Sequence, residues 1–254
     1  MRLFLKVTNK CNFHCGYCYY NTDYLHAPVI EEPTLESLKQ RMFLSHEMGA
    51  DSVSFTGGEP FLRSSVLFEL IDYADALQMK SIVVTNGSYF MKSVDKALEE
   101  VINKVSCMAI SMHIDIDTDI ERYFSDMKRA ITENLSFFLN RIRFNLTLTK
   151  SNAAQVRKCV SFAESLGIDI NIQPVVINKN AILYSNYSLA LLNGDEISDT
   201  CDQIMLWATK SHNEIYGRKL CSQLYANITK YNECLAGKSF FVVLENGHVL
   251  PCFY

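Results

Sequence analysis

The stretch RLFLKVTNKCNFHCGYCY, residues 2–19, decides how the rest of this chain is interpreted. Residues 2–8 are mostly apolar and predict a strand. Cys11, Cys15 and Cys18 follow within the next ten residues. A cysteine cluster outside a secreted disulfide scaffold indicates metal binding or catalysis. We therefore expect a strand whose carboxyl end carries a metal-binding loop.

Strand-like and helix-like segments alternate after this first strand. The predicted strands cover residues 2–8, 51–56, 80–85, 105–112, 141–149 and 168–177. The predicted helices between them cover residues 34–48, 64–78, 93–102, 118–140 and 151–166. Such a series gives a parallel sheet that curls, because each crossover is right-handed. Six strands do not close an eight-stranded barrel, so we expect an α/β fold, an open partial (β/α)6 TIM-like barrel, with reactive residues at the carboxyl ends of its strands.

The pattern changes after residue 177. Residues 178–198 are polar and irregular, and helix-like stretches follow at 197–211 and 219–230. Two short apolar runs, 239–244 and 248–251, are joined through Asn-Gly, which is a hairpin signal. We expect a barrel domain at residues 1–180 and a small C-terminal helix plus β-hairpin extension at residues 181–254.

Composition limits the partners. A length of 254 residues fits one α/β barrel domain, and 48% hydrophobic residues suffice for a sizeable core. The net charge of −4 gives no electrostatic reason to expect nucleic acid. No apolar run is long enough to span a bilayer, and the N-terminus has no secretory signal. We expect a cytoplasmic protein with no nucleic-acid or membrane partner.

The spacing C-x3-C-x2-C of the N-terminal cysteines suits an iron–sulfur cluster. Such clusters are usually held by four cysteines, so three thiolates leave one iron open for a ligand. A structural zinc site completed by His14 or His26 is the alternative, although this spacing fits zinc less well. Cys107 and Cys159 lie in apolar runs and are expected in the core.

A second motif follows the second predicted strand. Gly57-Gly58-Glu59-Pro60 begins directly after residues 51–56. Two glycines allow a sharp turn or a close approach of the backbone to a ligand, and Glu59 offers a carboxylate. Because parallel strands end at the same edge of a sheet, we expect this motif beside the cysteine loop.

Together, TNKCNFHCGYCY (residues 8–19) and FTGGEPF (residues 55–61) resemble the two motifs of the radical S-adenosylmethionine (radical SAM) superfamily. The resemblance covers about residues 2–177. It implies that Cys11, Cys15 and Cys18 ligate a [4Fe–4S] cluster and that S-adenosylmethionine occupies the fourth iron. It further implies that Tyr17 lies against the adenine, and that the methionine amino group is held by Gly57, Gly58 and Glu59.

Polar residues at later strand ends extend this expected cofactor site. Ser111 matches the family's polar residue on the fourth strand, and Asn86 matches a third-strand position, although Asn86-Gly87 is equally consistent with a plain turn. Asn145 and Gln173 are placed to reach the ribose or the carboxylate of the cofactor, with a satisfied core glutamine as the alternative for Gln173. His113 is assigned no catalytic role.

The C-terminal cysteines resemble half of an auxiliary-cluster extension. Cys234 and Cys252 flank the predicted hairpin, as in the SPASM or shorter twitch extensions of radical SAM enzymes, where they bind a second iron–sulfur cluster. Those extensions supply further cysteines downstream of the hairpin, and this sequence contains none there. Three alternatives follow: a truncated sequence, a reduced site completed by Cys221 and Cys201, or no auxiliary cluster.

The expected activity is reductive cleavage of S-adenosylmethionine to a 5′-deoxyadenosyl radical that abstracts hydrogen. The SPASM-like cysteines favour a maturase-like oxidoreductase that modifies a peptide or protein side chain. Two alternatives remain, a small-molecule dehydrogenase of the cyclitol or sugar type and a non-catalytic metal-binding scaffold. The electron donor expected for the enzyme is a flavodoxin or a ferredoxin.

Overall fold

The computed structural model describes residues 1–18, 31–91, 96–115, 117–175, 187–225, 240–243 and 249–250. Its centre is one sheet with the strand order β6-β5-β4-β3-β2-β1-β7-β8. The strands that follow one another in chain order are β1 (Arg2–Thr8), β2 (Ser52–Gly57), β3 (Lys80–Thr85), β4 (Cys107–Met112), β5 (Ile142–Leu148) and β6 (Asp169–Pro174). Each pairs in parallel with the next. The predicted parallel sheet is confirmed.

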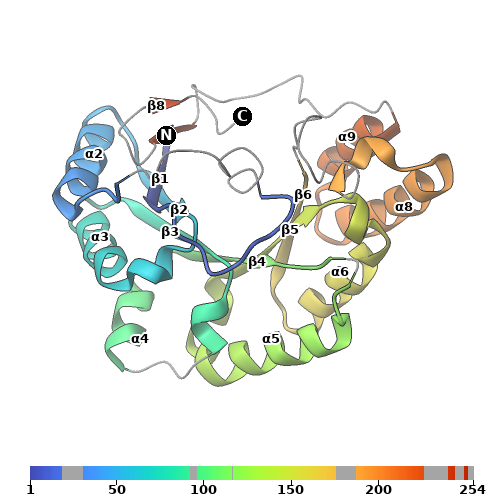
Figure 1. Cartoon of the computed structure of the whole chain (residues 1–254), viewed down its shortest axis with the longest axis horizontal. Coiled ribbons are helices and arrows are strands. Elements are labelled where there is room, and N and C mark those ends of the chain that lie inside the picture. Colours follow the sequence, from blue (N-terminus) through green and yellow to red (C-terminus); the bar gives the residue numbers. More distant parts are fainter. Residues whose placement is uncertain are drawn as a thin grey trace.

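The helices between these strands cover the convex face of the curved sheet (Figure 1). They are α2 (Leu35–Glu47), α3 (Ser64–Ala76), α4 (Lys96–Asn103), α5 (Ile120–Asn134) and α6 (Val156–Ser165). The described sheet forms an arc that does not close on itself (Figure 1). The open partial barrel expected from the βα series is therefore confirmed.

Alternation along each strand separates a packed outer face from a hollow inner face. On β5, the outer side chains Phe144, Leu146 and Leu148 are fully buried, as the apolar alternation predicts. The inner side chains Asn145 and Thr147 line cavities instead. Barrel interiors are usually filled by bulky branched side chains. Small and polar residues on this inner face leave room for a ligand.

Local capping signals set the helix ends. Thr34 caps α2, since its side chain accepts a hydrogen bond from the Ser37 amide. The predicted helix 118–140 is too long, because α5 ends at Asn134 and residues Ser136–Arg141 form a 3₁₀ helix. The break occurs where Leu135 and Phe138 both turn into the core.

Two C-terminal helices cover the open edge of β6. They are α8 (Gly194–Lys210) and α9 (Glu214–Tyr225), and both begin earlier than predicted (Figure 1). For α8 the reason is a capping box between Asn193 and Glu196. Trp207 Nε1 donates to the Ile170 carbonyl at 3.2 Å, and the Tyr216 hydroxyl donates to the Ile172 carbonyl at 2.8 Å. Carbonyls that an edge strand would leave unpaired are thereby satisfied.

The predicted hairpin is present and joins the barrel sheet. Strand β7 (Phe240–Val243) pairs in parallel with β1, and β8 (Val249–Leu250) pairs antiparallel with β7. A domain boundary near residue 180 stays a prediction. The helices in the described part of the chain include none with the length and apolar character needed to cross a membrane.

Candidate functional site

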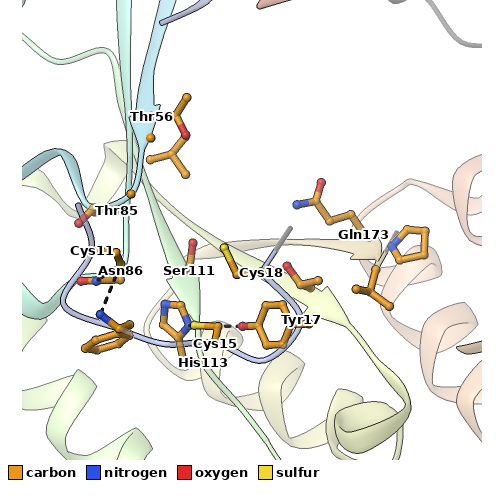
Figure 2. A pocket seen from close by; sticks show the side chains of 17 residues that line it. Cys11, Cys15, Tyr17, Cys18, Thr56, Thr85, Asn86, Ser111, His113 and Gln173 are labelled. Carbon is orange, nitrogen blue, oxygen red and sulfur yellow. Dashed lines mark hydrogen bonds between the residues drawn. The ribbon is translucent and has the colours of Figure 1, made fainter. Parts of the chain in front are cut away.

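A cavity of about 310 Å³ lies at the carboxyl ends of the strands (Figure 2). The loop that follows β1 contributes Cys11, Cys15, Tyr17 and Cys18 to its wall. The ends of the other strands contribute further residues that the sequence singled out, namely Gly57, Gly58, Asn86, Ser111 and Gln173. Residues from both ends of a 170-residue stretch thus meet at one place, as expected for the carboxyl edge of a parallel barrel.

Gly57 and Gly58 hold the base of the cysteine loop. The Gly58 amide donates to the Thr8 carbonyl and the Glu59 amide donates to the Lys10 carbonyl, both at 2.8 Å. A Cβ on Gly57 would collide with the Thr8 carbonyl oxygen, and a Cβ on Gly58 with that of Lys10. The close backbone approach expected of the glycines is therefore made to the chain that leads into Cys11, while both residues also line the cavity.

The Glu59 side chain points into the protein, toward β3. One carboxylate oxygen accepts from the Thr85 hydroxyl at 2.8 Å and from the Phe61 amide at 3.1 Å. The other accepts from the Asn86 amide at 2.7 Å. Burial raises the pKa of Glu59, and these three hydrogen bonds oppose the rise. Glu59 is 1% exposed and is not among the described residues that line the cavity, so its predicted contact with the methionine amino group stays a prediction.

Asn86 connects the end of β3 to the cysteine loop. Its side-chain amide donates to Asn12 Oδ1 at 2.8 Å. The same amide lies 3.9 Å from Cys11 Sγ, and Figure 2 shows these two residues side by side. Asn86 Oδ1 accepts a hydrogen bond from the Ser88 backbone amide. The Ser88 hydroxyl in turn accepts one from the Asn12 side chain. Asn86 therefore both forms the turn after β3 and contacts the cysteine loop. Sequence reasoning had no signal for Asn12, because its partner is more than seventy residues away.

Cys15, Tyr17 and His113 form the centre of the site (Figure 2). His113 Nδ1 lies 3.2 Å from Cys15 Sγ and 3.3 Å from the Tyr17 hydroxyl. The other ring nitrogen, Nε2, is buried and has no hydrogen-bond partner among the described residues. Burial lowers the pKa of His113 to about 4, so the ring is neutral at physiological pH. No role was expected for His113 from its sequence position, and the structure places it against Cys15, a predicted metal ligand.

The donor set fits a metal cluster. Burial raises the pKa of the Cys15 thiol to about 11, and the neighbouring Cys18 and Cys11 add to the rise. Three thiolates here would repel one another, so a cationic group is needed for all three to ionise. No three His, Cys, Asp or Glu side chains in the described ranges converge on a single-ion site. Instead the three thiols line one cavity, an arrangement that suits the larger core of an iron–sulfur cluster.

The ends of β4 to β6 present unpaired polar groups. Ser111, Thr147 and Gln173 line the cavity, and their side chains make no hydrogen bond to any residue that the structure describes. These groups remain available to a ligand. Asn145 lies deeper on the inner face, on a larger cavity, where its side-chain oxygen is 3.5 Å from Asn171 Nδ2.

The remaining cysteines separate into three groups. Cys234 and Cys252 lie outside the described residues, so the auxiliary cluster stays a prediction. Cys201 and Cys221 are buried where α8 packs on α9, and the Cys221 thiol donates to the Cys201 carbonyl at 3.7 Å. Cys159 is in the core as expected. The same expectation was wrong for Cys107, which is half-buried on the hollow inner face because it alternates with the outward Met108.

The model of the family described as "Radical SAM superfamily" matches residues 5–174, which include every residue of both motifs. The chain belongs to this superfamily. Its cofactors are therefore a [4Fe–4S] cluster and S-adenosylmethionine. Two crystal structures, described as anSMEcpe with bound AdoMet, share the fold with TM-scores of 0.68 and 0.66. They are 19% and 20% identical in sequence, with 99% and 100% of this chain and 71% and 74% of those chains covered.

Curated relatives are similar to this chain in sequence. The GTP 3′,8-cyclase of Desulforamulus reducens is 28% identical over 150 residues, covering 58% of this chain and 46% of the relative. A probable GTP 3′,8-cyclase of Sulfolobus acidocaldarius is 26% identical over 208 residues, covering 78% of this chain and 63% of the relative. The chain thus spans about half to two thirds of the length of these relatives.

Proposed function

We propose that this radical SAM enzyme abstracts a hydrogen atom from a small polar molecule that enters the hollow barrel. When bound, the reduced cluster and S-adenosylmethionine would supply the electron and the 5′-deoxyadenosyl radical that such an abstraction needs. The observation that carries the proposal is the position of the three thiols: they line a cavity together with Ser111, Thr147 and Gln173, whose side chains have no hydrogen-bond partner among the described residues.

Each wall of the site has a distinct task. Cys11, Cys15 and Cys18 would hold the cluster. Ser111 and Gln173 would hydrogen-bond to polar groups of S-adenosylmethionine or of the substrate, because they have no partner among the described residues. Tyr17 would form an aromatic wall, with its hydroxyl turned toward His113. Enclosure of the reacting atoms by this wall would keep the radical away from hydrogen donors other than the substrate.

The wall of the barrel favours a small polar substrate. The cavity is continuous with a larger hollow, which is lined by hydroxyl and amide side chains such as Ser54, Asn145 and Asn171. The curated relatives are named for the cyclisation of a nucleotide, GTP, and we take that class as the first to test. A one-electron donor such as a flavodoxin or a ferredoxin completes the proposal.

The decisive measurement is formation of 5′-deoxyadenosine by anaerobically reconstituted protein with dithionite and S-adenosylmethionine. We expect basal formation by the wild type, faster formation with GTP, and none with Cys15→Ala. A candidate deuterated at the abstracted position should transfer deuterium to 5′-deoxyadenosine. No product from fully loaded wild-type protein with either small molecules or peptides would overturn the enzyme function. Stimulation by a peptide alone would replace the small-molecule proposal with peptide modification.

A further inference from the structure

A second, larger cavity of about 1020 Å³ lies on the inner face of the barrel toward the amino ends of the strands. It shares Thr56, Val84 and Gln173 with the thiol-lined cavity, so the two are continuous. The hollow exists because its wall has small inward side chains such as Ser52, Ser54 and Ala109 where barrels usually carry branched aliphatic ones. A ligand at the thiols can therefore extend into the barrel.

Cations exceed carboxylates around this second cavity. Arg2, Lys80 and Arg143 line it, and Asp51 is the one acidic residue among its described lining residues. Asp51 is already engaged, because its carboxylate lies 3.2 Å from the N-terminal amine and accepts from the Ser52 hydroxyl. The described residues that line this cavity therefore carry more positive than negative charge.

Of the three cations, only Arg143 has an acidic neighbour among the described residues. Arg143 Nη2 lies 3.8 Å from Asp169 Oδ2, and both side chains are more than half exposed, so this pair is weak. Arg2 and Lys80 have no ion-pair partner within the described parts of the chain. An anionic ligand would find at least two uncompensated cations here.

Two of the cations line the same cavity although their strands are far apart in the sheet. Arg2 is on β1 and Arg143 is on β5, with three strands between them. Burial raises the pKa of the Cys107 thiol on β4, and the Arg143 and Arg2 guanidinium groups both oppose that rise. The Asp169 carboxylate acts in the opposite direction on the same thiol, so charges from β1, β5 and β6 all reach the inner wall at β4.

We propose that this cavity binds the phosphate groups of a phosphorylated small molecule whose reacting carbon lies in the thiol-lined cavity. The proposal rests on the proposed function and deepens it by naming the substrate class. Guanidinium groups match phosphate oxygens in paired hydrogen bonds, which favours phosphate over a neutral ligand. Asn145 and Asn171 lie between the two ends and supply donors and acceptors for the middle of the molecule.

The dimensions fit a molecule of nucleotide length. Arg143 lines the larger cavity and Thr147 the thiol-lined cavity, and both are on β5. Four residues of strand separate them, which corresponds to about 13 Å. A single phosphate ion would not bridge that distance, whereas a nucleoside triphosphate or an extended sugar phosphate would.

The test is ligand binding by the cluster-loaded protein, measured by calorimetry without S-adenosylmethionine. The probes are inorganic tripolyphosphate, the four nucleoside triphosphates with their nucleosides, and ribose 5-phosphate. We expect tripolyphosphate and at least one triphosphate to bind, and each nucleoside to bind at least about tenfold more weakly, because it lacks the charge-assisted hydrogen bonds. Binding by ribose 5-phosphate instead of the triphosphates would assign the site to a sugar phosphate.

Substitution of the cavity cations tests whether the phosphate groups bind in this cavity. Arg143→Gln and Arg2→Gln should each weaken binding at least about tenfold. The matched control is Lys158→Gln on α6, a cation that lies 3.7 Å from Glu121 away from the cavity and should leave binding unchanged. Equal weakening by the control, unchanged binding in both arginine variants, or no binding by wild type would each overturn the proposal. Failure of the proposed function would show separately, as absence of 5′-deoxyadenosine in the wild type.

Discussion

At the ends of β1, β2 and β3 the polar groups bind one another, whereas Ser111, Thr147 and Gln173 on β4, β5 and β6 face the cavity with no hydrogen-bond partner among the described residues. Glu59 illustrates the first side, since its carboxylate accepts three hydrogen bonds from within the protein. Ser111 and Gln173 illustrate the second, with no described hydrogen bond. His113 stands between the two, with one ring nitrogen near Cys15 and the other unpaired.

The two groups of strand ends differ in what their polar side chains do: the first group fixes the cysteine loop, and the second is open to a ligand. Buried polar groups are costly unless they are paired, so the first three strand ends use theirs to fix the backbone that leads into the thiols. The last three leave theirs to be paired by a ligand. Substitutions at the ends of β1, β2 and β3 should therefore alter stability and cluster retention. Substitutions at the ends of β4, β5 and β6 should alter cofactor properties with little loss of stability.

The largest expected effect is loss of the cluster. Cys15→Ala removes a proposed ligand that no other described residue replaces, so iron should fall by about four atoms per chain after anaerobic reconstitution. Iron assay and the visible absorption of the cluster measure this. Cys107→Ala, on the inner wall away from the loop, is the control and should keep its iron.

The next largest effect is expected at Gly58, which follows β2 and holds the cysteine loop. Gly58→Ala drives a Cβ into the Lys10 carbonyl, so the backbone must shift and unfolding should become easier by about 3 kcal/mol, with poorer cluster retention. Urea denaturation followed by circular dichroism measures the stability. Gly194→Ala at the start of α8 meets nothing within 4 Å and should change stability by less than about 1 kcal/mol. Equal effects in the two variants would show that Gly58 is not a point of close approach.

Glu59 gives a prediction that depends on pH. Its pKa is raised in the folded state, so the folded protein binds the proton more tightly than the unfolded chain. The contribution of Glu59 to stability is then fully present below the ordinary pKa of 4.5 and is lost as pH rises through the raised value.

In Glu59→Gln this pH-dependent part should disappear. At higher pH the amide would also turn one N–H toward groups that are all donors, so we expect a loss of about 1–3 kcal/mol. Denaturation curves from pH 4 to pH 8 compare the two proteins. A wild-type profile that the variant reproduces without offset would contradict the role of this carboxylate.

The smallest effect concerns His113 and the cluster potential. In the tautomer that carries its proton on Nδ1, His113 would donate to the Cys15 sulfur and would stabilise the reduced cluster. His113→Leu should then lower the midpoint potential by roughly 40 mV, which corresponds to one hydrogen bond of about 1 kcal/mol. A redox titration followed by electron paramagnetic resonance measures it.

Two further variants identify the nitrogen responsible. An asparagine amide occupies a position close to Nδ1, so His113→Asn should retain most of the wild-type potential, whereas His113→Gln should not. Equal midpoint potentials in the wild type and the three His113 variants, all with a full cluster, would show that His113 does not influence the cluster. Stability should change little in His113→Asn, in contrast to Glu59→Gln.

Much of the fold followed from local pattern. Every predicted barrel strand is present, because alternation and apolar runs depend on neighbouring residues alone. The errors occurred where distant contacts decided an end, as at Asn134, where α5 stops because Leu135 and Phe138 enter the core. The start of α8 was missed for a different reason, an unnoticed capping box between Asn193 and Glu196.

The sequence by itself determined which residues could hold the cluster, because the spacing of Cys11, Cys15 and Cys18 is a local property that chemistry constrains directly. Only the tertiary structure decided where the Glu59 carboxylate points and that His113 lies against Cys15. Both depend on strands that are adjacent in the sheet or across the barrel mouth but distant in the chain. The hollow with its surplus of cations is likewise visible only after the sheet curls and places Arg2 and Arg143 around one cavity.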